Sequence, residues 1–208
     1  MKLKPLIVNG LTFARVPLIF AWAVLAILQE YDQSFWTAFW ACAMMLFSGL
    51  TDAWDGALAR KWDVVSTLGK MADPLMDKVF YLVAFPVIAW QAMHQSESEV
   101  HALVMVAFTV LYMIRDTWVT FMRSVGAMYG ADVAAMWLGK VRTALSFPGA
   151  GWVYMYLCFH RMAPASWDFP WLVSAYFVEG ALILLTLVSL YTYTKAYMPY
   201  LKKALASR

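Results

Sequence analysis

A short polar stretch, residues 52–77, in an otherwise apolar chain contains five aspartates, four of which form two close pairs. Asp52 and Asp55 are three residues apart, and Asp73 and Asp77 are four residues apart. Residues at these spacings share one face of an α-helix, so two helix ends could bring four carboxylates together. Carboxylate oxygens are the ligands that hard divalent cations prefer. The stretch therefore predicts a divalent-cation site, most simply for Mg²⁺.

Small residues and one arginine are interleaved with these carboxylates. Gly56, Ala59 and Gly69 carry little or no side chain, which allows a ligand to approach the backbone closely. Arg60 presents a planar fork of N–H donors that suits a phosphate. The combination predicts a site that holds cations and a phosphate together. The alternative is that these residues are only the solvated ends of two helices joined by a loop.

The composition is that of an integral membrane protein. Of the 208 residues, 63% are hydrophobic and only 14% are charged, whereas soluble domains have roughly 25% charged residues. The net charge of +3 is too small to argue for a nucleic-acid partner, and the 11 Trp and 11 Tyr suit belts at the membrane interfaces. The length favours a single domain, residues 1–208.

The apolar runs predict an all-α bundle of six transmembrane helices, preceded by a short basic segment at the membrane interface. Lys and Arg are concentrated in alternate connections and at both ends of the chain, which places the termini and the carboxylates on the cytoplasmic side. The interfacial segment is expected over residues 1–10, and the spans are expected over residues 11–28, 35–50, 79–92, 102–114, 140–159 and 171–193.

Several other polar residues fall within or between these runs. Cys42 and Cys158 lie in apolar runs without pairing or metal spacing, and we interpret them as buried small hydrophobes. Glu179 lies in the middle of the last span, where a hydrogen bond between helices is the expected role. The three histidines are expected at the surface, on the side away from the cytoplasm: His94, His101 and His160.

The pattern D-x2-D-G-x2-A-R-x8-G-x3-D-x3-D resembles the signature of the CDP-alcohol phosphotransferase family. Members of this family displace CMP from a CDP-linked donor with an alcohol. The resemblance implies two Mg²⁺ ions, with Mn²⁺ as an alternative, and a homodimer. It implies metal binding by Asp52, Asp55, Asp73 and Asp77, a general base at Asp77, and donor binding by Asp52, Gly56, Ala59, Arg60 and Gly69.

Further segments resemble the phosphatidylglycerophosphate synthase branch of this family. They include L-G-K-M-A-D-P-L-M-D-K, in which Ala72 and Met76 depart from the usual residues, and I-R-D-T-W-V-T-F-M-R. The branch uses CDP-diacylglycerol and sn-glycerol 3-phosphate in the bacterial cytoplasmic membrane. The N-terminal N-G-L-T-F-A-R also resembles this branch, so Asn9, Thr12 and Arg15 are candidate donor-binding residues. Their alternative role is an interfacial cap with an arginine that extends to the surface.

A second basic set lies outside the signature and has few acidic residues near it in sequence. Cations in or near the membrane suggest function, and an anionic acceptor would explain these: Arg115, Arg123, Lys140 and Arg142. Positive-inside charge with lipid headgroup contacts is the alternative. Two other functions stay open: a sister enzyme that uses another alcohol, such as inositol phosphate or the less suitable serine, and a divalent-cation transporter.

Overall fold

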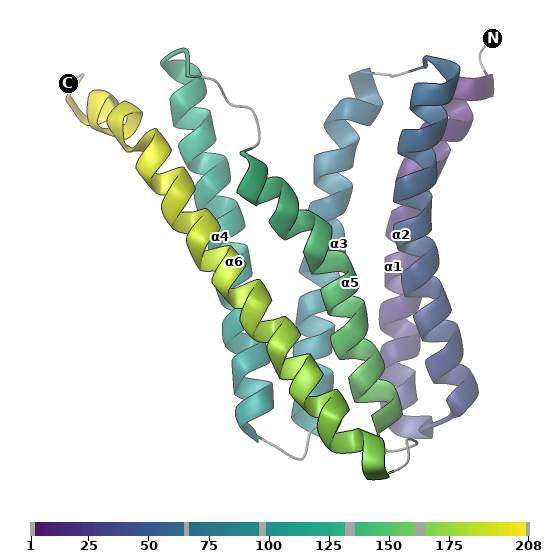
Figure 1. Ribbon diagram of the computed structural model, residues 1–208. Helices are drawn as coiled ribbons and strands as arrows, with labels where there is room; N and C mark the ends of the chain where they lie inside the picture. The colour runs from purple at the N-terminus through teal and green to yellow at the C-terminus, as the bar shows by residue number, and fades with distance from the viewer. Residues whose placement is uncertain (1–2, 65–66, 96–98, 132–135, 161–164, 207–208) are drawn as a thin grey trace.

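The computed structural model confirms an all-helical protein (Figure 1). It describes residues 3–64, 67–95, 99–131, 136–160 and 165–206, except for the side chains at 67, 68, 70, 71, 73, 74, 95 and 165–168. Within these ranges there are six α-helices and no strands. The helices are α1 (Leu3–Asp32), α2 (Phe35–Trp62), α3 (Thr67–Gln95), α4 (Glu99–Met128), α5 (Trp137–Phe159) and α6 (Ala165–Ala206).

Four of the described helices are long and apolar enough to cross a membrane. They are α1, α4, the Leu75–His94 part of α3 and the Phe169–Ala206 part of α6. The other two, α2 and α5, do not meet the same test of length and composition over their described residues. Both nevertheless pack against apolar helices, α2 against α1 and α5 against α6. Membrane crossing by α2 and α5 stays a prediction.

The packing order places α3 and α5 between two outer pairs of helices (Figure 1). On one side, α1 packs against α2 and α3, and on the other side, α4 packs against α3 and α6. Large buried side chains fill the space between them, including Trp22 of α1, Phe85 of α3, Phe108 of α4 and Tyr154 of α5. The end of α2 and the start of α3 lie at the same end of the bundle as the start of α1 and the end of α6 (Figure 1). The polar stretch therefore lies at that end.

The helices extend beyond the predicted spans. Residues 3–10 form the first turns of α1 and are not a separate segment. Similarly, α6 continues through the basic tail to Ala206. Pro5 lies in the first turn of α1, where its missing N–H has no intrahelical acceptor and no bond is lost. The connection between α1 and α2 is short, since α1 ends at Asp32 and α2 begins at Phe35. Ser34 caps α2, because its hydroxyl accepts a hydrogen bond from the Trp36 backbone N–H at 3.3 Å.

The surface prediction for the histidines is wrong for two of the three. His101 lies in the first turns of α4 and is fully buried, and its Nε2 lies 2.6 Å from Oε1 of Glu179 on α6. His160 at the end of α5 is also buried, with Nδ1 3.1 Å from two backbone carbonyl oxygens. The predicted loop at 94–101 is shorter than expected because α4 begins at Glu99. The interhelical hydrogen bond predicted for Glu179 is confirmed.

The predictions for His94 and the cysteines agree with the structure. His94 is exposed near the end of α3. Cys158 is buried in the core, Cys42 packs partly buried against it, and both thiols are free.

Candidate active site

Three carboxylates from two helices meet at the guanidinium of Arg15 on α1. Its Nη2 lies 2.5 Å from Oδ1 of Asp52 and 3.3 Å from Oδ2 of Asp55, both on α2. Its Nη1 lies 2.9 Å from Oδ1 of Asp77 on α3. The spacing of the aspartates placed Asp52 and Asp55 on one helix face, and the packing of α1 against α2 and α3 brings Asp77 to the same point.

The three carboxylates differ in their exposure. The Asp55 side chain is only 5% exposed, and its Oδ2 accepts a hydrogen bond from the Thr12 hydroxyl at 2.7 Å. The side chains of Asp52 and Asp77 are 56% and 43% exposed. Asp55 is therefore fixed against α1, whereas the carboxylates of Asp52 and Asp77 are partly accessible to a ligand. Thr12 and Arg15 lie three residues apart on α1, so one face of that helix supplies both contacts.

The chemistry of this donor set fits a divalent cation, because all three side chains are hard oxygen donors gathered around one positive group. Among the described side chains, no three of His, Cys, Asp and Glu lie close enough together to hold one ion. The Arg15 guanidinium lies between the oxygens instead. The side chain of Asp73 lies outside the described residues. The predicted Mg²⁺ site at these aspartates stays a prediction.

The other predicted donor residues lie on α1, α2 and α3, outside the walls of the two cavities described below. Arg60 is exposed, and its guanidinium folds back over Gly56, where a Cβ atom would meet Nη1 at 3.4 Å. Ala59 lies on the same part of α2, and Gly69 lies in the first turn of α3. Asn9 lies one turn before Thr12 on α1. Their role in donor binding stays a prediction.

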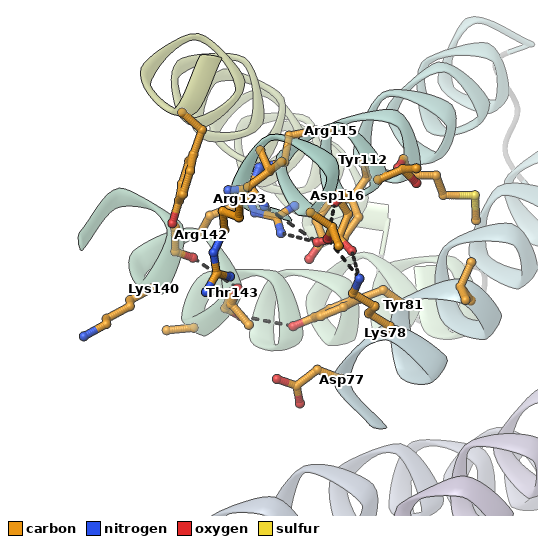
Figure 2. Close-up of a pocket in the computed structure, with 18 residues that line it drawn as sticks. Asp77, Lys78, Tyr81, Tyr112, Arg115, Asp116, Arg123, Lys140, Arg142 and Thr143 are labelled. Atoms are coloured by element: carbon orange, nitrogen blue, oxygen red, sulfur yellow. Dashed lines mark hydrogen bonds and ion pairs between the residues drawn. The ribbon is translucent and has the colours of Figure 1, made fainter. Parts of the chain in front are cut away.

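A cavity of about 580 Å³ opens beside Asp77 (Figure 2). Helices α3, α4 and α5 form most of its wall, and Tyr193 of α6 contributes a ring. Five basic residues line it, namely Lys78, Arg115, Arg123, Lys140 and Arg142. The structure thus brings all four residues of the predicted acceptor set to one cavity, and it places the predicted base in the wall of that cavity.

Two of the arginines are buried and held by aromatic rings. Arg142 lies over the ring of Tyr112 at 4.1 Å from its centroid, and Arg115 lies over the ring of Tyr193 at 5.1 Å. Arg115 also donates a hydrogen bond to the Ser189 hydroxyl. A guanidinium that stacks on an aromatic face is attracted by the ring and keeps its N–H groups available in its own plane.

Some N–H groups of these arginines have no protein acceptor. Nε and Nη1 of Arg142 and Nε of Arg115 are buried and have no hydrogen-bond partner among the described residues. Unpaired buried donors cost free energy, and a charged group left unpaired costs more than a neutral one. These three N–H groups are themselves buried, so what the two arginines offer to the cavity is their positive charge. The wall of the cavity is therefore suited to a phosphate or a similar group.

The remaining basic residues are more exposed. Lys140 points away from the arginines (Figure 2), and Arg123 lies half-buried two turns beyond Arg115 on α4. Lys78 was missed by the sequence analysis, although it directly follows Asp77. Its Nζ lies 3.2 Å from Oδ2 of Asp116 and donates a hydrogen bond to the Thr120 hydroxyl at 3.1 Å. Its position beside a predicted catalytic aspartate was the signal that could have revealed it.

A second cavity of about 250 Å³ adjoins the first. Arg15, Asp52 and Ser48 form its polar part, and aromatic and proline side chains form its apolar part. The walls of the two cavities share four residues, Asp77, Tyr81, Thr143 and Ala144. The hydroxyl of Tyr81 donates to the backbone carbonyl of Thr143 at 3.1 Å and so ties α3 to α5 at this boundary. Asp77 therefore faces both cavities.

Comparison with known proteins identifies the family. The family model of the CDP-alcohol phosphatidyltransferases matches residues 6–190. Similar curated proteins include the CDP-diacylglycerol–glycerol-3-phosphate 3-phosphatidyltransferases of Escherichia coli (strain K12) and Shigella flexneri serotype 5b (strain 8401). Each is 28% identical over 127 residues, which is 61% of this chain and 66% of the relative. The match with these relatives thus spans just under two thirds of their length. Because the family model covers most of the sequence, the chain belongs to the CDP-alcohol phosphatidyltransferase family.

Proposed function

We propose that the protein transfers a phosphatidyl group from CDP-diacylglycerol to sn-glycerol 3-phosphate, giving phosphatidylglycerol phosphate and CMP. The observation that carries the choice of acceptor is the cavity beside Asp77, with the five basic residues that line it. A phosphorylated alcohol brings a net negative charge to these cations, whereas the carboxylate of serine is offset by its own ammonium group. The names of the 28% identical relatives support the same reaction.

The two adjoining cavities suggest how the substrates meet. The smaller cavity, with Arg15 and Asp52 at its polar end, suits the phosphates of the donor, and the larger one suits the acceptor. In the proposed reaction the acceptor hydroxyl oxygen bonds to the phosphorus that carries diacylglycerol. The bond from that phosphorus to the CMP oxygen breaks, and the hydroxyl proton passes to Asp77. Holding both substrates at one boundary supplies the proximity that direct transfer needs.

Asp52, Asp55, Asp73 and Asp77 would hold the two Mg²⁺ ions that we propose as cofactors. When bound, these ions would neutralise charge on the pyrophosphate and on the leaving CMP. The protein's own contribution at this point is the fixed position of Asp55, which the Thr12 hydroxyl and the Arg15 guanidinium hold against α1. Arg15 lines the smaller cavity and contacts the carboxylates, which supports the donor-binding role that we propose for it.

An acceptor screen tests the proposed function. The purified protein in detergent is given CDP-diacylglycerol and Mg²⁺ with glycerol 3-phosphate, inositol phosphate or serine, and the products are weighed by mass spectrometry. We expect phosphatidylglycerol phosphate and CMP with glycerol 3-phosphate, and no release of CMP in excess chelator. A phosphatidylinositol phosphate product would instead identify a sister enzyme. A divalent-cation transporter, which membership of a transferase family disfavours, would release no CMP with any acceptor.

We also propose that both termini and the active site face the cytoplasm of a bacterium, in its inner membrane. The alternation of Lys and Arg supports this orientation. Glu99→Cys and Lys202→Cys place thiols on exposed residues of α4 and α6. In intact cells an impermeant thiol reagent should label the first and not the second, and the opposite result would reverse the topology. The homodimer implied by the family resemblance is tested by light scattering of the detergent-solubilised protein.

A further inference from the structure

One carboxylate lies among the basic residues of the larger cavity. Oδ2 of Asp116, on α4, lies 3.2 Å from Nζ of Lys78 on α3. Its Oδ1 lies 3.5 Å from Nη2 of Arg142 on α5 and 3.7 Å from Nη1 of Arg115 on α4 (Figure 2). Asp116 therefore connects cations from the three helices that form most of the cavity wall.

The carboxylate of Asp116 attracts the two arginines but does not form a close hydrogen bond with either. Charge-assisted N–H···O bonds are about 2.7–2.9 Å long, and both contacts are longer than this. Buried N–H groups on both guanidinium groups have no hydrogen-bond partner among the described residues. Asp116 therefore limits the repulsion between Arg115 and Arg142 and keeps them oriented, and its single charge leaves the three cations with positive charge for a second anion.

Lys78 is held in the same way. Its ammonium is fixed between the carboxylate of Asp116 and the hydroxyl of Thr120, both on α4. The side chain is 41% exposed, and it lines the cavity next to Asp77. A flexible lysine loses much rotamer entropy when it binds a ligand. Contacts that fix it in advance reduce that cost, which is the general advantage of preorganisation.

We propose that Lys78 is a further binding residue for the acceptor phosphate, and that Asp116 is the positioning residue that holds Lys78, Arg115 and Arg142 ready for it. The proposal rests on the proposed function in one respect, since it takes the acceptor to be a phosphate monoester. Asp116 does not contact the reacting atoms. It acts through the three cations that it holds.

The direction in which KM changes when Asp116 is neutralised distinguishes a positioning residue from one that plays no part in binding. A carboxylate inside an anion-binding cavity repels the ligand, so a bystander that is neutralised should give tighter phosphate binding. A positioning residue should do the opposite, because its removal leaves three cations that repel one another and lose their shared anchor. The same substitution therefore predicts opposite changes in KM under the two interpretations.

The test compares Asp116→Asn with the wild type in detergent. We expect the KM for glycerol 3-phosphate to rise about tenfold, the scale of one lost charge-assisted contact, and the KM for CDP-diacylglycerol to stay unchanged. Asp116→Glu keeps a carboxylate and should recover part of the affinity. Lys78→Gln should raise the same KM. In the double variant the combined effect should be smaller than the product of the two single effects, because each removes part of one interaction.

Lys202→Gln is the matched control, because it removes one exposed positive charge on α6 away from the cavity. A KM for glycerol 3-phosphate that falls or stays constant in Asp116→Asn would overturn the proposal. If that variant does not fold, Lys78→Gln alone decides, and an unchanged KM for glycerol 3-phosphate in it rejects the proposal.

Calorimetric binding of glycerol 3-phosphate and of inorganic phosphate separates this inference from the proposed function. Weaker binding by Asp116→Asn supports the inference even if no CMP is released by the wild type. Equal or tighter binding by the variant rejects it even if the wild type is fully active.

Discussion

Arg15 on α1 donates to Asp77 on α3, with 2.9 Å between Nη1 and Oδ1. The same guanidinium contacts Asp52 and Asp55 on α2. One buried cation thus ties the first three helices together at the end of the bundle that carries the predicted active site. The oxygens that bind Arg15 are also the oxygens predicted to bind cations, so the two compete for the same lone pairs.

This competition predicts the stability of Arg15→Gln. Without the guanidinium, Asp52, Asp55 and Asp77 lose the positive charge that they share. We expect the variant to unfold several degrees below the wild type in chelator, and Mg²⁺ to raise its Tm by more than it raises that of the wild type. Thermal unfolding in detergent, followed by near-UV circular dichroism, measures both values.

Lys202→Gln, which also removes one positive charge, serves as the control for the Arg15 prediction and should keep the Tm of the wild type in both conditions. Equal effects of Mg²⁺ on the wild type and on Arg15→Gln would show that the guanidinium and the cation do not share these carboxylates.

The basic residues of the larger cavity should differ in importance. Arg142 is buried, stacks on Tyr112 and has unpartnered N–H groups, whereas Lys140 is exposed and points away (Figure 2). Arg142→Lys keeps the charge but loses the planar fork and the stacking. We expect it to raise the KM for glycerol 3-phosphate by more than Lys140→Gln does, with no change in the KM for CDP-diacylglycerol. A rise in both KM values would assign Arg142 a general electrostatic role.

The sequence predicted the residues that share a helix face but not the helices that would face them. The spacing of Asp52 and Asp55 is a local property, and α-helical geometry alone places them together. The contacts of Arg15 with three carboxylates, and of Asp116 with Lys78 and Arg142, join residues that are far apart in sequence. Periodicity carries no information on such pairs. For the same reason the sequence predicted a hydrogen bond for Glu179 but not its partner.

That partner, His101, leads to a prediction about stability. Its Nε2 and Oε1 of Glu179 are 2.6 Å apart, and both side chains are buried away from the two cavities. Glu179→Ala leaves the imidazole without this contact, and loss of one partner in a buried pair costs about 1–3 kcal/mol. We expect a lower Tm with unchanged KM values for both substrates.

The double variant His101→Phe, Glu179→Leu should lose less stability than Glu179→Ala, because it removes both ends of this hydrogen bond together. A change in either KM in Glu179→Ala would instead connect this pair to the active site.

The last prediction concerns the way in which Asp77 acts. It could take a proton from the acceptor hydroxyl, or it could first form a covalent bond to the phosphatidyl group. Its place in the wall of both cavities favours the base, since donor and acceptor can lie on either side of it at once.

Asp77→Asn should therefore bind CDP-diacylglycerol but lose turnover by a factor of about 10²–10⁴, the usual contribution of a general base. Binding of labelled CDP-diacylglycerol and release of CMP measure the two effects. The wild type distinguishes the two mechanisms. Direct transfer requires both substrates, so labelled CMP should not exchange into the donor when glycerol 3-phosphate is absent, and initial-rate lines should intersect. Rapid exchange without acceptor, together with parallel lines, would establish a covalent intermediate and exclude the base role.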